Sequence, residues 1–263
     1  MLSEQIALGV ALTCFAVVLL LSVARPAHQS LSVAGLMVAA MVLLTGIILR
    51  WDRIGQGPFL TMFEVLLSNL FSLSLVYAIL YWRIERLRPT LPIIMSLLIL
   101  LAAWALLSPP DTLLLPPTFN HPWLWLHVIA GKLFLAFCMS AAGLAILLLL
   151  NQSYDIASTS VSTPTHDPIV WKLMAVAFIF HSFMLIAGAV WAHDAWGRYW
   201  SWDPLETWSL LTWLSLAIVL HLRLTFRLQP ALGWLLVTGV FAVAFLTFFG
   251  VPFVSMAPHK GAM

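Results

Sequence analysis

The sequence predicts an all-α fold: a polytopic integral membrane bundle of about eight transmembrane helices, forming a single membrane domain over residues 1–263. Composition is the first reason, because 62% of the residues are hydrophobic and only 8% are charged, whereas soluble domains carry about 25% charged residues. The second reason is the length of the apolar runs, each of which has about the 20 residues that a helix needs to cross a bilayer. The net charge of +2, scattered between these runs, gives no indication of nucleic acid binding.

The predicted spans are joined by short connections, and no soluble domain is left between them. The first span lacks the positively charged start of a secretory signal peptide and is followed by Arg25, so we expect a retained helix whose amino end lies outside. An Asp-Pro pair opens the seventh span. The eight spans are Gln5–Ala24, Leu31–Leu49, Pro58–Trp82, Leu91–Leu107, Trp123–Leu150, Ile169–His193, Pro204–Phe226 and Ala231–Val254.

The distribution of Lys and Arg predicts how the bundle is oriented, because these residues are enriched on the cytoplasmic side. With the amino end outside, seven of them fall on the cytoplasmic side and four on the outer side. The segment between the sixth and seventh spans then faces the periplasm or an equivalent compartment. The seven are Arg25, Arg83, Arg86, Arg88, Lys172, Arg223 and Arg227.

Residues 191–213 differ from the apolar runs around them, because they hold six Trp, one Tyr and several ionisable residues. The preference of aromatic residues for the membrane–water boundary explains two or three of these rings, but not this density. Gly197 and Pro204 interrupt the helix within the segment. A flat aromatic surface with few charges at the edge of a bilayer suits a large, flat, amphipathic ligand, and haem is the obvious candidate.

The run from Trp196 to Trp208, W-G-R-Y-W-S-W-D-P-L-E-T-W, resembles the tryptophan-rich WWD signature of haem-handling membrane proteins. Within that group it is most similar to the CcsA/ResC family of cytochrome c biogenesis System II, whose signature continues through a Thr-Trp pair and an L-H-x-R run, present here at 212–213 and 220–223. The family usually has Lys where this chain has Leu205, which leaves Arg198 as the candidate partner of the haem propionates. The resemblance implies a haem surface made of Trp196, Tyr199, Trp200, Trp202, Asp203 and Trp208.

The resemblance also implies three axial ligands of haem iron, for which His is the commonest residue. His127 lies in a W-x-x-x-H-V run at the outer start of the fifth span and corresponds to one external ligand. His259 corresponds in position to the second external ligand, although its Ala-Pro-His-Lys-Gly context differs from the family's L-H-S-Y-G. Together they imply a six-coordinate bis-His haem. His221, near the inner end of the seventh span, corresponds to one ligand of an intramembrane haem whose other ligand comes from a CcsB or ResB subunit.

Some of these polar residues also have ordinary structural explanations. Glu64 is either partly hydrated near the outer interface or faces the binding cavity or an arginine, and the similar Gly-Pro-to-Glu stretch of the family favours the second. Asp203 is well placed to cap the seventh helix, with Glu206 completing a capping pattern. His181 lies in mid-helix, where a helix–helix hydrogen bond is the alternative to a functional role. His193 is interpreted as a hydrogen-bonding group rather than a ligand.

The resemblance implies a membrane subunit of cytochrome c biogenesis in a bacterial cytoplasmic or thylakoid membrane, with the Trp-rich loop on the periplasmic or lumenal side. It would bind haem b, present it at the outer face and promote its covalent attachment to an apocytochrome c with a CxxCH motif, together with a CcsB/ResB-like subunit. The chain itself has no CxxC spacing, and no catalytic residue is assigned. The alternatives are a haem exporter or chaperone of the CcmC type, against which the P-x-E-T-W continuation argues, and a non-catalytic membrane subunit that retains the fold.

Overall fold

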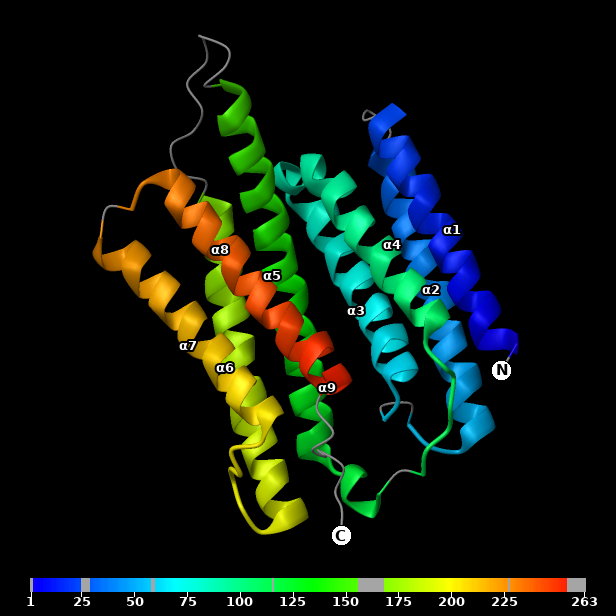
Figure 1. Ribbon diagram of the computed structural model, residues 1–263. Coiled ribbons are helices and arrows are strands. Elements are labelled where there is room, and N and C mark those ends of the chain that lie inside the picture. The colour runs from blue at the N-terminus through cyan, green and yellow to red at the C-terminus, as the bar shows by residue number, and fades with distance from the viewer. Residues whose placement is uncertain are drawn as a thin grey trace. The chain divides into compact units, whose positions relative to one another are not determined.

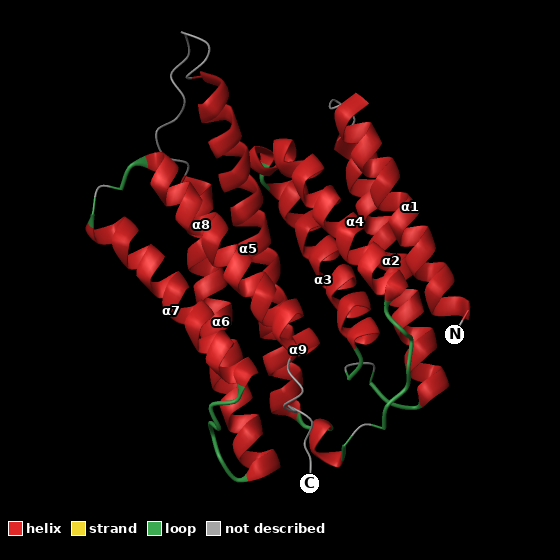
Figure 2. Cartoon of the chain, viewed as in Figure 1, coloured by secondary structure: helices red, strands yellow, loops and turns green. Residues whose placement is uncertain are grey.

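The computed structural model describes residues 2–24, 29–57, 60–114, 116–155, 168–226 and 228–254. These residues form helices joined by short loops, and no strand occurs among them (Figure 2). Eight of the described helices are long and apolar enough to cross a membrane, which confirms the predicted all-α, polytopic membrane fold. The chain divides into two compact units, Met1–Leu115 and Pro116–Met263, and each is described by itself.

The first unit contains four long helices and one 3₁₀ turn. Helix α2 packs against α1 and α3, and α4 also packs against α1 and α3, so the apolar faces meet in one core that includes Leu8, Leu36, Leu66 and Leu98. Large apolar side chains such as Leu20, Val38 and Leu107 are also exposed, as expected for helices that face lipid. The elements are α1 (Leu2–Ala24), α2 (Gln29–Ile54), α3 (Met62–Arg83), η1 (Glu85–Thr90) and α4 (Leu91–Leu107), coloured from blue to green in Figure 1.

The second unit is built around the long pair α5 and α6. Helix α8 packs against α5, and α7 packs against α6 and α8. Proline opens α5, α6, α7 and α8, at the position where its missing N–H leaves no hydrogen bond unmade. The elements are η2 (Pro117–Phe119), α5 (Pro122–Asp155), α6 (Pro168–Trp196), α7 (Pro204–Thr225), α8 (Pro230–Phe245), the π-helical turn η3 (Leu246–Gly250) and α9 (Val251–Val254), coloured from green to red in Figure 1.

Several helix boundaries differ from the prediction, and polar contacts explain two of them, the end of α2 and the start of α3. Helix α2 continues to Ile54 instead of ending at Leu49, because Arg50 is fully buried and paired with Glu64 rather than exposed at a helix end. Helix α3 begins at Met62 instead of Pro58, because Thr61 caps it. The Thr61 side chain accepts a hydrogen bond from the Glu64 N–H, and the Glu64 carboxylate accepts one from the Thr61 N–H, which together form a capping box.

Candidate functional site

The loop between α6 and α7 carries the Trp-rich signature and is fixed at both ends. Gly197 ends α6 with a φ of 74°, a left-handed conformation that Gly adopts without strain, and its N–H donates to the His193 carbonyl at 2.8 Å. At the other end, the Asp203 carboxylate accepts from the Glu206 N–H at 2.9 Å and forms the predicted cap of α7. The buried Glu206 carboxylate reaches past the cap and accepts from the Ser201 N–H at 2.6 Å. These contacts tie both ends of the loop to the flanking helices.

Trp202 has an unusual backbone in this loop. Its φ is 60°, the only positive value for a non-glycine residue in the described part of the chain, and such a conformation costs about 1–3 kcal/mol for a bulky residue. The indole is 70% exposed and meets the Trp200 ring edge-on, with the centroids 5.9 Å apart. Burial therefore does little to offset the strain, and the loop presents this ring outward at an energetic cost.

A pocket of about 180 Å³ lies beside this loop, between α5, α6, α7 and η3. His127 of α5 lines it together with Tyr199 and Trp200 of the loop, so the fold brings three of the predicted site residues together. Most of the remaining lining is apolar. It includes Met184 and Gly188 of α6, Leu205 of α7, and Phe248 of η3.

The orientation of His127 is set by the backbone of α6. Its Nδ1 lies 2.8 Å from the Met184 carbonyl oxygen. Because a carbonyl can only accept, Nδ1 of the neutral imidazole carries the hydrogen and Nε2 carries the lone pair. A β-carbon at Gly188 would lie 2.6 Å from the same Nδ1, so the ring rests directly on the helix backbone. A hydrogen bond from one ring nitrogen to a carbonyl is the usual way in which proteins orient a metal-binding His.

The other predicted aromatic residues are not in the pocket lining. Trp196 is half-buried and meets the Trp191 ring edge-on, with centroids 4.9 Å apart. Trp191 is buried and donates from Nε1 to the Thr118 carbonyl at 2.9 Å, so this pair supports the loop. Trp208 is 37% exposed. Arg198 is exposed and forms no ion pair with the described residues.

His193 supports the loop through a ring contact. Its imidazole stacks on Tyr199, with centroids 4.3 Å apart and an interplanar angle of 14°. Its Nδ1 lies 3.5 Å from Oδ1 of the neighbouring Asp194. The structure therefore gives His193 one polar contact and one stacking contact beside the pocket.

Sequence reasoning missed two residues that shape the pocket. Gly188 makes the close approach of His127 to α6 possible, and the run Ala187-Gly188-Ala189 was the available signal, because small residues let membrane helices approach closely. Phe248 lies in the π-helical turn η3, and nothing in its apolar surroundings distinguishes it in the sequence. Turns of this kind occur frequently at functional sites.

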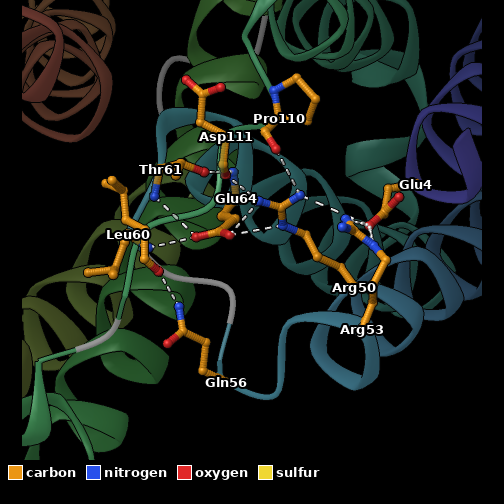
Figure 3. Close-up of polar contacts among 10 residues, drawn as sticks. Glu4, Arg50, Arg53, Gln56, Leu60, Thr61, Glu64, Pro110 and Asp111 are labelled. Atoms are coloured by element: carbon orange, nitrogen blue, oxygen red, sulfur yellow. Dashed lines mark hydrogen bonds and ion pairs between the residues drawn. The ribbon is translucent and has the colours of Figure 1, made fainter. Parts of the chain in front are cut away.

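Glu64 faces an arginine in the first unit. Its Oε1 accepts from Nε and Nη2 of Arg50 at 2.9 and 2.7 Å, and its Oε2 accepts from the Leu60 N–H at 2.8 Å (Figure 3). Arg50 also donates to the carbonyls of Pro110 and Asp111, at 3.4 and 2.6 Å. Both charged side chains are buried, at 0% and 3% exposure. Of the two interpretations of Glu64, the paired carboxylate therefore holds and the hydrated one does not.

Of the other histidines that the structure describes, His221 and His181 are not in the pocket lining. His221 is exposed on α7, with Nε2 3.4 Å from the Thr225 hydroxyl. His181 is buried in α6 and stacks on Phe134. His259 lies outside the described residues. The pocket thus contains one imidazole from the part of the chain that the structure describes.

Comparison with known proteins identifies the family. The model of the cytochrome c assembly protein family matches residues 59–259, more than half of the chain. The chain is 27% identical over 270 residues to the cytochrome c biogenesis protein CcsA of Helianthus annuus, covering 85% of this chain and 84% of the relative. It is 29% identical over 245 residues to CcsA of Prochlorococcus marinus strain MIT 9312, covering 81% and 79%.

A solved structure, the cytochrome c haem lyase CcmF, shares the fold. Its TM-score is 0.69 at 17% identity, and the match covers 94% of this chain and 46% of the other. This chain therefore spans less than half the length of that structure. The CcmF likeness agrees with the family model, whose match includes the Trp-rich loop and the α5–α6 pair. Because the family model matches more than half of its residues, the chain belongs to the cytochrome c assembly protein family.

Proposed function

We propose that this chain is a membrane subunit of cytochrome c biogenesis that binds haem b, presents it at the outer face of the membrane and promotes its attachment to apocytochrome c. The observation that carries the proposal is His127, which lines an aromatic pocket with Nδ1 bonded to the Met184 carbonyl and the lone pair on Nε2. No group of three or more His, Cys, Asp or Glu that could hold a bare metal ion occurs among the described residues. A single oriented imidazole suits haem iron, for which His is the commonest protein ligand.

The lining and the rim of the pocket fit a porphyrin. The pocket, at about 180 Å³, is smaller than the roughly 300–1,000 Å³ of ordinary ligand pockets, so a bound porphyrin would extend beyond it. Exposed rings lie nearby in the same segment, with Tyr199 at 58% and Trp202 at 70% exposure. Aromatic faces suit a flat apolar ring, and the exposed guanidinium of Arg198 suits its propionates. Leu205 lines the pocket and adds apolar contact there.

A second external ligand and a partner subunit complete the proposal. We assign the second ligand to His259, from its position after the eighth span. His221 is exposed on a membrane-spanning helix, where an imidazole facing lipid is unfavourable. This exposure supports a role for His221 in a haem site shared with a CcsB/ResB-like subunit.

The residues of this chain bind and orient the ligand and leave one edge of the site open. His127 would hold the iron, and the loop anchored by Asp203 and Glu206 would keep Tyr199, Trp200 and Trp202 in place. Haem supplies the vinyl groups to which the two thiols of a CxxCH segment add. The exposed outer rim is the side from which an apocytochrome would approach.

Reconstitution tests the function directly. The chain and a ResB-like subunit are expressed in a bacterial host that lacks its own maturation system, with a reporter apocytochrome c exported to the periplasm. Covalent haem on the reporter is then measured after denaturation. We expect attachment with the wild-type pair and loss with His127→Ala. A purified chain that binds haem but never supports attachment, with any ResB-like partner, would identify an exporter or chaperone instead.

A further inference from the structure

A second cavity lies in the first unit, at the end of the bundle where α1 and α3 end and α2 and α4 begin. This is the end opposite the N-terminus, and the turn η1 forms part of the cavity wall (Figure 1). The volume of about 400 Å³ falls within the range of roughly 300–1,000 Å³ that ordinary ligand pockets have. Most of the lining is polar, which suits a polar ligand. The polar lining residues are Ser22 of α1, Gln29 and Ser32 of α2, Tyr81 of α3, and Glu85 and Arg88 of η1.

Tyr81 brings an unused hydroxyl to this cavity. It is only 3% exposed, yet its hydroxyl makes no hydrogen bond with the described residues. Tyr77, one turn earlier in α3, shows the usual arrangement, since its hydroxyl lies 2.9 Å from the Thr90 hydroxyl. The two rings contact each other, with centroids 6.1 Å apart. Because buried polar groups are normally hydrogen-bonded, the Tyr81 hydroxyl is available to a ligand in the cavity.

Arg88 and Glu85 place two opposite charges on the wall. Nη1 of Arg88 lies 3.0 Å from Oε1 of Glu85, with side-chain exposures of 27% and 80%. This contact uses one of the five N–H donors of the guanidinium, so the remaining donors can bind a phosphate, which Arg recognises well. The Glu85 carboxylate can accept from an ammonium group. The wall therefore suits a ligand that carries both charges better than a simple anion.

The surroundings of the cavity have the features of a membrane boundary. Trp82 is 59% exposed, and its ring lies 4.6 Å from the guanidinium carbon of Arg83. Exposed Trp and basic residues are both typical of membrane interfaces. On α1, Leu20 and Val23 flank Ser22 in the sequence and are 68% and 70% exposed. A polar cavity thus lies next to apolar surface that can contact acyl chains.

We propose that this cavity binds the headgroup of a glycerophospholipid that carries both a phosphate and an ammonium group, of the ethanolamine type. In this arrangement Arg88 and Tyr81 donate to the phosphate oxygens, and Glu85 accepts from the ammonium group. The acyl chains lie along the exposed side chains of Leu20 and Val23. A headgroup with phosphate alone fits less well, because nothing in it pairs with Glu85. The inference is independent of the proposed haem function.

Lipid-dependent thermal unfolding of the full-length chain in detergent tests the proposal. A ligand that binds the folded state raises the unfolding temperature as its concentration increases. The three probes are dioleoylphosphatidylethanolamine, dioleoylphosphatidylglycerol and the water-soluble headgroup phosphoethanolamine. We expect the wild type to bind the ethanolamine lipid about two- to fivefold more tightly than the glycerol lipid, as for one exposed ion pair. Glu85→Gln should abolish this preference.

The variants locate the site. Arg88→Gln and Tyr81→Phe should each weaken binding of the ethanolamine lipid at least about tenfold, as for the loss of a hydrogen bond to a charged group. Arg86→Gln, which removes an exposed cation outside the lining, should leave the affinity unchanged. Tyr77→Phe removes a hydroxyl that is bonded within the protein. It should lower the unfolding temperature without lipid but keep the rise on lipid addition.

Three results would overturn the proposal. Wild-type lipid affinity in both Arg88→Gln and Tyr81→Phe would show that the lipid binds elsewhere on the surface. Equal affinity of the wild type for the two lipids would contradict the contact of Glu85 with an ammonium group. Phosphoethanolamine that binds as tightly as the lipid would show that the cavity takes a soluble phosphate compound. Haem binding is not measured, so each result leaves the proposed function untouched.

Discussion

The imidazole of His127 rests on the α6 backbone at Gly188, where a β-carbon would lie only 2.6 Å from Nδ1. The same nitrogen is 2.8 Å from the Met184 carbonyl. One face of α6 thus supplies both the space for the ring and the hydrogen bond that selects its tautomer.

Gly188→Ala should displace His127 while leaving the helix intact. The added methyl group occupies the place of the ring, so the imidazole must move and lose its bond to Met184. We expect haem affinity of the purified chain to fall about 10- to 100-fold, as when the hydrogen-bonded support of a metal ligand is removed. Haem titration followed in the visible spectrum measures this.

Gly239→Ala is the matched control for that change. A β-carbon at Gly239 in α8 would meet no atom within 4 Å, so only helix propensity changes, by about 1 kcal/mol in favour of Ala. Haem affinity should stay at the wild-type value. Equal affinity losses in the two variants would show that Gly188 has no special relation to His127.

Trp202→Asn should separate binding from stability. Asn tolerates the left-handed backbone found at this position, and the Trp202 ring buries little surface. We expect the unfolding free energy to stay constant or to rise by up to about 1 kcal/mol, while haem affinity falls. Thermal unfolding in detergent and haem titration give the two readouts.

Trp191→Phe provides the contrast. Trp191 is 2% exposed and donates to the Thr118 carbonyl, so the substitution leaves a partly buried carbonyl without this donor and should lower stability by about 1–3 kcal/mol. If Trp202→Asn lowers stability as much as Trp191→Phe, the ring of Trp202 is a packing residue and its strained backbone has no functional significance.

Breaking the Arg50–Glu64 pair should strongly destabilise the first unit. Arg50→Met leaves the Glu64 carboxylate buried without its partner, at a cost of about 3–5 kcal/mol. The double variant Arg50→Met/Glu64→Leu should be more stable than Arg50→Met, because it removes the unpaired charge. Unfolding in detergent measures the full double-mutant cycle. Strictly additive effects would contradict the pairing.

Asp203→Ala should loosen the start of α7. The Asp203 carboxylate accepts from the Glu206 N–H, and loss of such a cap costs about 1 kcal/mol. Asp203→Asn keeps an oxygen that can accept this bond, so it should retain most of the stability. The difference between the two variants in thermal unfolding isolates the cap. Two equally unstable variants would point to the charge of Asp203 rather than to capping.

The sequence predicted the helices well, because each apolar run is long enough to cross the bilayer, and a run of that kind forms a helix. The ends of α2 and α3 were harder to predict. Arg50 and Glu64 lie 14 positions apart in the chain, and their mutual neutralisation is a tertiary contact that hydropathy does not reveal. The two interpretations of Glu64 were separated only by that contact.

The pocket was predictable in part. The density of aromatic residues located the loop, and the resemblance selected His127. The left-handed backbone of Trp202 was not foreseeable, because a bulky residue disfavours it intrinsically. The contact of His127 with Gly188 depends on the register of two antiparallel helices, which apolar periodicity alone does not determine. The position of Phe248 depends on the π-helical turn, which apolar periodicity alone also does not determine.

The spectrum of the purified full-length chain with ferrous haem tests the central claim most directly. The wild type should show a low-spin, imidazole-ligated haem. His127→Ala should lose or convert that species, whereas His221→Ala should leave it unchanged in the absence of a ResB-like subunit. A His127→Ala variant with the haem content, affinity and spectrum of the wild type would contradict the assignment of the pocket beside the Trp-rich loop as the haem site.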